Sequence, residues 1–136
     1  MSQEKLKKRN ALVMWIIWFG ILQSAFVVQV FVGGGLPKGE NASEPMAVWL
    51  WIVCFAPIVI ATVIRWLVIP KLKKPQQMLA AMIIGLSCAE SSVFYQLFLI
   101  GEDYPQNQIA VLMVAIVALI QFAPGYATPG YVPKKH

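Results

Sequence analysis

Four long apolar runs constrain this chain more than any other feature. They cover about residues 11-32, 46-69, 78-100 and 108-124, and only Arg65 and Glu90 are charged within them. A helix needs roughly 20 residues to cross a hydrocarbon core of about 30 Å, so each run is long enough for one span, although the fourth is the shortest. The runs are continuously apolar and do not alternate, which favours helices over barrel strands. The sequence therefore predicts an all-α, integral membrane four-helix bundle.

Composition excludes the soluble and disordered classes. Hydrophobic residues make up 59% of the 136 residues and charged residues only 12%, about half the charged fraction of a soluble domain. A soluble domain this small could not bury so much apolar surface, and a disordered chain has the opposite composition. The four spans use most of the chain, so we expect residues 1-136 to form a single membrane domain.

The distribution of cations predicts the orientation. Apart from Lys38, every Lys and Arg residue precedes the first run, follows the fourth run, or lies at the second connection, where Arg65 falls near the end of the second run. The positive-inside rule therefore places both termini in the cytoplasm, and we expect a bacterial inner membrane. Because the cations adjoin apolar spans, we expect their partner to be the lipid bilayer and not nucleic acid. The predicted membrane-surface cations near the first three spans are Lys5, Lys7, Lys8, Arg9, Arg65, Lys71, Lys73 and Lys74.

The first run has two interpretations. A basic start, an apolar stretch and Gln23-Ser24-Ala25 match a signal peptide with a cleavage site. The apolar part of a signal peptide is about 7-15 residues long, whereas this run is longer and continues through Ala25. The length favours an uncleaved helix, with the signal peptide as the alternative.

The residue inventory argues against catalysis and cofactor binding. The only histidine is His136, no lysine lies inside a run, and Cys54 and Cys88 lack the spacing of a metal site. Haem ligation, His-based acid-base catalysis, a Schiff base and a zinc site are therefore not expected. The sequence predicts a protein that is not an enzyme and has no metal or cofactor.

Glu90 is the charge that needs an explanation, because it falls at the middle of the third run. A charged residue there costs at least about 2.5-3.5 kcal/mol on insertion scales, so it is expected to face other protein and to be functional. At similar depth lie Gln23, Ser24 and Ser87, and together with Glu90 they form the predicted intramembrane polar site. Arg65 either pairs with Glu90 or extends to the membrane surface.

Three roles for Glu90 stay open. It can hold the bundle together by a hydrogen bond, handle a proton or another ion, or contact a ligand or pigment. The stretch Gly85-Leu86-Ser87-Cys88-Ala89-Glu90 resembles the carboxylate helix of the rotary ATPase c subunit, the proteolipid. The resemblance covers about one span of four, and it implies that Glu90 reversibly carries a proton or sodium ion. The glycine-repeat helix of that family and a carboxylate in the first hairpin are missing here, so the rotary function is not implied.

Small residues mark candidate helix-packing faces. On the third run they form a stripe, roughly opposite Glu90, and on the first run they form a pair at a spacing of four. Small residues let membrane helices approach closely, either inside the bundle or against another subunit. The predicted packing residues are Ala81, Gly85, Cys88 and Ser92 in the stripe, and Gly20 with Ser24 in the pair.

These observations favour a small polytopic membrane protein that acts as a structural or accessory subunit through helix packing. Its expected partner is another membrane protein or a second copy of the chain. The alternative is a proton- or ion-translocating membrane protein that uses Glu90.

Overall fold

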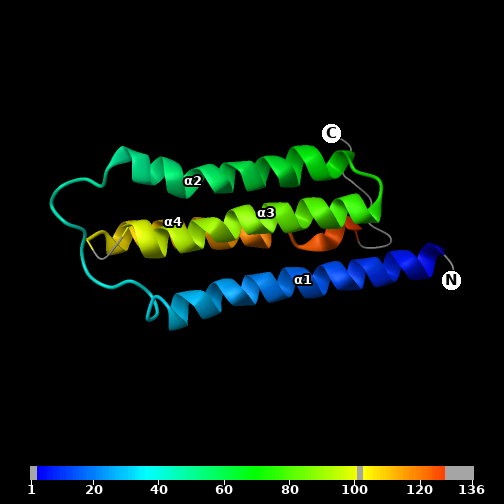
Figure 1. The fold of residues 1–136 in the computed structure, drawn as a ribbon, viewed down its shortest axis with the longest axis horizontal. Coiled ribbons are helices and arrows are strands. Elements are labelled where there is room, and N and C mark those ends of the chain that lie inside the picture. The colour runs from blue at the N-terminus through cyan, green and yellow to red at the C-terminus, as the bar shows by residue number, and fades with distance from the viewer. Residues whose placement is uncertain (1–2, 101–102, 128–136) are drawn as a thin grey trace.

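A computed structural model describes residues 3-100 and 103-127 (Figure 1). Every element of secondary structure among these residues is a helix or a helical turn, and none is a strand. The four main helices are α1 (Gln3–Phe31), α2 (Val48–Val63), α3 (Pro75–Tyr95) and α4 (Pro105–Ile120). With their helical extensions, the four stretches that are long and apolar enough to cross a membrane are Lys5–Phe31, Val48–Lys71, Pro75–Ile100 and Pro105–Tyr126. The all-helical fold with four membrane-span-like helices is thus confirmed.

Short irregular turns extend three of these helices. The wide π-helical turn η1 (Ile64–Val68) and the tight turn η2 (Ile69–Lys71) continue α2, and a second π-helical turn, η3 (Gln96–Ile100), continues α3. The tight turn η4 (Pro124–Ala127) follows α4. Pro75 and Pro105 begin α3 and α4, where a missing N–H costs nothing because the first helical turn has no internal acceptor for it.

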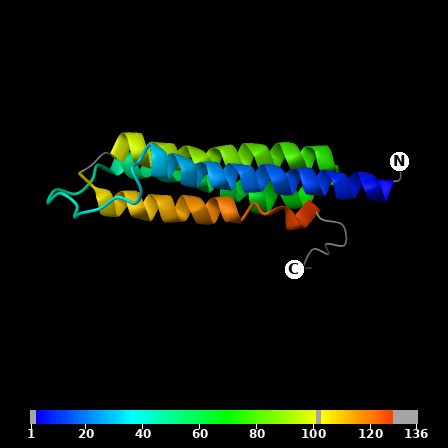
Figure 2. The same ribbon diagram turned by 90° about the horizontal axis from the view of Figure 1, so that it is seen from below.

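The helices alternate in direction and lie side by side along the length of the molecule (Figures 1 and 2). α3 packs against α1, α2 and α4, and it packs against its neighbours more extensively than any other helix does. Only 17% of the most apolar part of α1 is buried, against 39% for α3 and for α4. Most of the apolar surface of α1 therefore points outward, as expected where lipid surrounds a helix.

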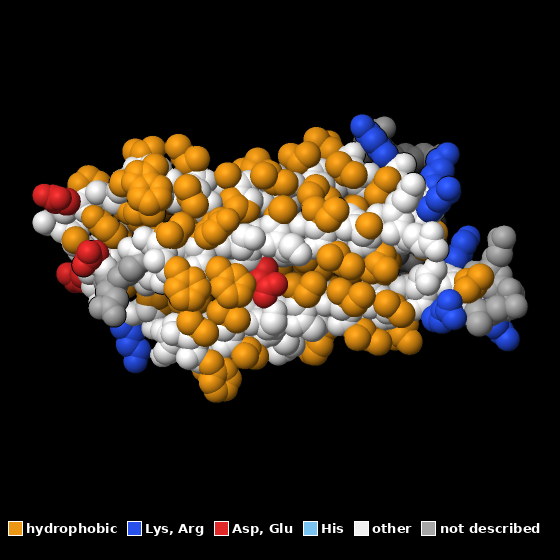
Figure 3. Space-filling view, in the orientation of Figure 1, with side chains coloured by type: hydrophobic (Ala, Val, Ile, Leu, Met, Phe, Trp, Pro, Cys, Tyr) orange, Lys and Arg blue, Asp and Glu red, His pale blue; other side chains and the backbone are white. Residues whose placement is uncertain are grey.

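Charged side chains gather at the two ends of the bundle, and apolar side chains cover the surface between them (Figure 3). Lys and Arg side chains cluster at the end where α1 begins. An acidic side chain also shows midway along this face. Lys134, Lys135, His136 and Glu102 lie outside the described residues.

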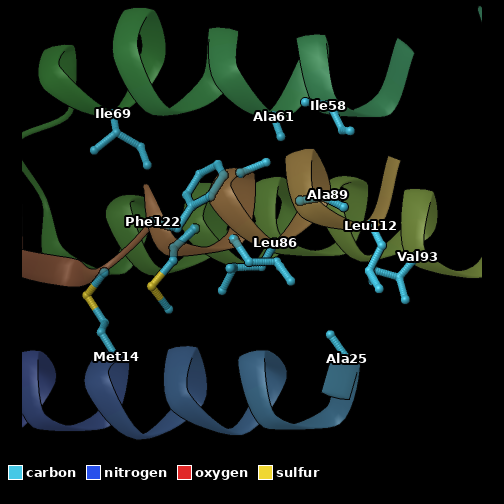
Figure 4. Packing of buried hydrophobic residues seen from close by; sticks show 14 residues of the cluster. Met14, Ala25, Ile58, Ala61, Ile69, Leu86, Ala89, Val93, Leu112 and Phe122 are labelled. Atoms are coloured by element: carbon cyan, nitrogen blue, oxygen red, sulfur yellow. The ribbon is translucent and has the colours of Figure 1, made fainter. Parts of the chain in front are cut away.

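The core forms where α3 approaches its neighbours most closely (Figure 4). Phe122 is fully buried, and its ring lies so close to Gly85 that a Cβ at Gly85 would overlap it. Ser92, in the same stripe, is also fully buried, while Ala81 and Cys88 are partly buried. The small-residue stripe of α3 therefore packs inside the bundle.

Gly20, the small residue predicted to pack on α1, does not pack inside the bundle. Gly20 is exposed, and a Cβ built on it would meet no atom within 4 Å. The predicted pair Gly20 and Ser24 thus does not bring α1 close to another helix of this bundle at Gly20. The open space leaves Gly20 available to a neighbour outside the chain.

The two glycines should respond differently to an added methyl group. We expect Gly85→Ala to lower the free energy of unfolding by about 1-3 kcal/mol, because Phe122 must move to admit the Cβ. Gly20→Ala, the matched control, should leave stability unchanged or raise it slightly, since Ala favours helix more than Gly does. Unfolding of both variants in mild detergent measures the difference, and equal stability of the two would contradict the packing.

Candidate functional site

Glu90 lies on the side of α3 that faces α1, about midway along the bundle. Ser24 of α1 donates its hydroxyl to Oε1 of Glu90 at 2.6 Å. Both side chains are only partly buried, so the pair sits at the lateral surface of the bundle in the junction between α1 and α3. Two members of the predicted polar site are therefore brought together by the fold.

The Ser24 hydroxyl has a second acceptor, because the carbonyl oxygen of Ile21 is 2.7 Å away. A hydroxyl has one proton to donate. If Glu90 is ionised, Ser24 donates to it. If Glu90 is protonated, the carboxylic acid can donate to Ser24, which then donates to Ile21. The pair can thus hydrogen-bond in either protonation state.

The other two predicted members form no hydrogen bond with Glu90 in the described part of the chain. Ser87 is exposed and donates to the carbonyl of Ile83 in its own helix at 2.8 Å, and Gln23 is exposed on α1. Ser91, which the sequence analysis overlooked, is partly exposed beside them and donates to the carbonyl of Ser87. We call the resulting surface the α1/α3 polar patch, and its members are Gln23, Ser24, Ser87, Glu90 and Ser91.

Arg65 is bound at the end of the bundle and does not reach toward Glu90. Its Nε donates to the carbonyl of Gln121 at 2.6 Å. The guanidinium carbon also lies 4.2 Å from the ring centre of Trp66 and 4.6 Å from that of Tyr126. Of the two alternatives for Arg65, the structure thus favours extension to the end of the bundle, where the cation stabilises the carboxyl end of α4.

A cluster of three glutamines forms the largest buried polar group, and the sequence analysis missed it. Gln96 is fully buried and donates through Nε2 to Oε1 of Gln29 at 2.7 Å. Gln29 donates to the carbonyl of Gly35, and Gln108 donates to the carbonyl of Gln96 at 2.9 Å. Oε1 of Gln96 is buried and has no hydrogen-bond partner among the described residues. We call these three side chains the glutamine cluster.

The glutamine cluster borders a pocket of about 600 Å³ at the end of the bundle opposite the start of α1. Gln29 and Gln108 line it together with Lys38, Leu97 and Phe98. The sequence does offer a signal for the glutamine cluster, because its three glutamines lie near the ends of the first, third and fourth apolar runs, at the same end of the bundle. The missing information was the π-helical turn η3, which begins at Gln96, the residue at the centre of the cluster.

Ser92 of α3 forms a hydrogen bond with α2 near Pro57. Pro57 has no N–H to offer the carbonyl four residues earlier, so it interrupts the hydrogen-bond ladder of the helix. The carbonyl of Cys54, next along, accepts the hydroxyl of Ser92 at 2.7 Å. A small polar residue of α3 thus joins α3 to the interrupted part of α2.

Comparison with protein-family models, with curated proteins and with solved structures found no match. Within residues 3-100 and 103-127, no three His, Cys, Asp or Glu side chains lie together as a metal site would require. The geometry of the polar groups themselves is therefore the basis for assigning a function.

The contact between Gln29 and Gln96 can be tested by a double-mutant cycle with Gln29→Met and Gln96→Met. Met is similar in length but cannot hydrogen-bond as an amide does. We expect a coupling energy of about 0.6 kcal/mol, the average for such bonds in a membrane protein, and at most about 1.7 kcal/mol. The free energy of unfolding of the four proteins in mild detergent measures it.

The matched control replaces Gln29→Met by Gln23→Met, because Gln23 is an exposed glutamine of the same helix. Its coupling to Gln96→Met should be zero within error. A coupling of the same size in both cycles would contradict a direct contact.

Proposed function

We propose that this protein is a non-catalytic accessory subunit of a membrane assembly, and that the α1/α3 polar patch is the surface that packs against its partner. The four apolar helices are compatible with a small membrane protein. The observation that carries the proposal is that Glu90 lies midway along the bundle and is only partly buried, while Gln23 and Ser87, at similar depth, are exposed.

Physical cost is the reason to expect a partner there. Ionisable residues inside a membrane almost always face other protein or water, because contact with hydrocarbon is expensive. Among the described residues, Glu90 accepts one hydrogen bond, from Ser24, and part of its side chain is exposed. A helix of a second membrane protein that offers hydrogen-bond donors would cover it.

Gly20 supports the same surface. It precedes Ser24 by one helical turn and therefore lies on the same side of α1. Because a Cβ there would meet no atom of the described residues within 4 Å, a partner helix can approach the backbone of α1 closely at Gly20. The helix-packing role of this glycine is thus assigned to an external contact.

Ion translocation through Glu90 is the second candidate. It is favoured by the pairing of Ser24 with Glu90, since the serine hydroxyl can accept a hydrogen bond from the carboxylic acid or donate one to the carboxylate. The local resemblance of the Glu90 helix to the rotary ATPase c subunit agrees with this role. In that case Glu90 would be the carrier and Ser24 the residue that positions it.

Photo-crosslinking in native membranes tests the accessory role. A photoreactive residue in place of Gln23, within the patch, should give a discrete protein adduct, whose mass shows a different protein or a second copy of the chain. The matched control is Val59, an exposed residue near the middle of α2, which should crosslink only to lipid. Protein adducts from both positions, or from neither, would contradict the proposal.

The variant Glu90→Gln separates the two candidates, because it keeps the shape of the side chain but cannot release a proton. If the protein is an accessory subunit, the variant should still form the crosslinked adduct. Loss of proton flux into vesicles in the variant would instead favour the carrier.

We propose that both ends of the chain lie in the cytoplasm and that the membrane is a bacterial inner membrane. The proposal rests on the cations that precede the first span and on those at the second connection, because the positive-inside rule places segments rich in Lys and Arg on the cytoplasmic side. Acidic residues and Lys38 occupy the other connections.

A single cysteine placed at Lys38 or at Asn107, in a chain without Cys54 and Cys88, should react with a membrane-impermeant maleimide added outside intact cells. A cysteine placed at Lys73 is the matched control and should react only after the membrane is permeabilised. The reverse pattern would overturn the orientation.

A further inference from the structure

A basic pocket lies at the end of the bundle where α1 begins and α3 starts. Its volume is about 410 Å³, and the cations that line it are Lys7 and Arg9 of α1 and Lys74, which precedes α3. Asn10 and Gln76 add side-chain amides to the same wall. No acidic residue lines the pocket among the described residues, so the site favours an anion.

The pocket continues into a narrow apolar crevice between α1 and α3. The crevice has a volume of about 30 Å³ and shares Asn10, Pro75 and Gln76 with the pocket. Farther along, it is lined by Val13, Met14 and Leu79. The polar wall thus passes directly into an apolar wall.

The position of the two cavities matches the profile of a bilayer. Lys74 lies just before the third span, Pro75–Ile100, and Arg9 lies just before the apolar run of the first. Leu79 is five residues beyond Lys74, or about 7 Å farther along the helix axis at 1.5 Å per residue. The cations therefore lie at the depth of the lipid headgroups, and the crevice lies at the depth of the first acyl carbons.

We propose that the basic pocket and the crevice together bind one anionic phospholipid. The phosphodiester lies among Lys7, Arg9 and Lys74, where Arg can form two parallel hydrogen bonds with phosphate oxygens. Asn10 and Gln76 donate to the headgroup, and an acyl chain follows the crevice past Val13 and Leu79. Basic pockets between membrane helices suit such headgroups. The inference does not depend on the α1/α3 polar patch or on its partner.

Native mass spectrometry of the full chain tests the site. The protein is equilibrated in mild detergent with equal amounts of phosphatidylglycerol and phosphatidylcholine that have the same acyl chains, and the ratio of the two in the singly lipidated protein is measured. The wild-type chain should retain phosphatidylglycerol preferentially. The variant Lys7→Gln/Arg9→Gln/Lys74→Gln should lose up to about a hundredfold of this preference, since each cation beside an anionic surface contributes roughly fivefold.

The matched control is Lys5→Gln/Lys8→Gln/Lys73→Gln, which removes the same charge from the same two segments but outside the pocket lining. It should keep the preference to within about fivefold. Equal losses in the two triple variants would show diffuse attraction to basic ends and overturn the proposal, as would the absence of a preference in the wild-type chain.

Two further measurements show whether the pocket binds a lipid or a free anion. Leu79→Trp fills the crevice and leaves every cation in place, so it should weaken phosphatidylglycerol binding although the charge is unchanged. Inorganic phosphate at millimolar concentration should not displace the lipid from the wild-type chain. Displacement by phosphate, together with unchanged lipid binding in Leu79→Trp, would show a site for free phosphate and overturn the lipid assignment.

Discussion

The cost of leaving a backbone carbonyl unpaired in hydrocarbon is the constraint on which this bundle depends. An uninterrupted helix satisfies its own carbonyls, but these four helices end or are interrupted at several points. Close to four of these points, a side chain of another helical segment donates to a backbone carbonyl, and each of these bonds joins two helices. The donors and their acceptor carbonyls are Trp18 to Leu119, Arg65 to Gln121, Ser92 to Cys54, and Gln108 to Gln96.

α3 packs more extensively against the other helices than any of them does. Its stripe of small residues packs inside the bundle, where Gly85 leaves room for the ring of Phe122 and Ser92 donates to the carbonyl of Cys54 in α2. The flank of α3 that carries Glu90 is therefore turned toward α1 and the surface. A carboxyl that is only partly covered by its own chain is an incomplete contact, and the proposed partner would complete it.

Particular residues show how far the sequence could predict the candidate site. The pairing of Ser24 with Glu90 followed from depth, because residues at the middle of two spans must lie at the same level. Depth alone also suggested Gln23 and Ser87, which the fold leaves exposed, since equal depth does not determine which way a side chain points around its helix. The glutamine cluster was missed because it forms at the π-helical turn that begins at Gln96, where the backbone carbonyl of Gln96 accepts from Gln108, and no local pattern of residue types predicts that turn.

The sequence by itself determined the class of this protein and its four helices. Hydrophobic runs of this length can satisfy their backbone in a membrane only as helices, whatever surrounds them. It also determined the segregation of charge between the two ends. Only the tertiary structure decided which face of each helix is buried, because that depends on how the helices rotate against one another to fit Phe122 at Gly85 and to form the hydrogen bonds between helices. The same rotations placed Lys7, Arg9 and Lys74 around one pocket, although they come from two separate segments of the chain.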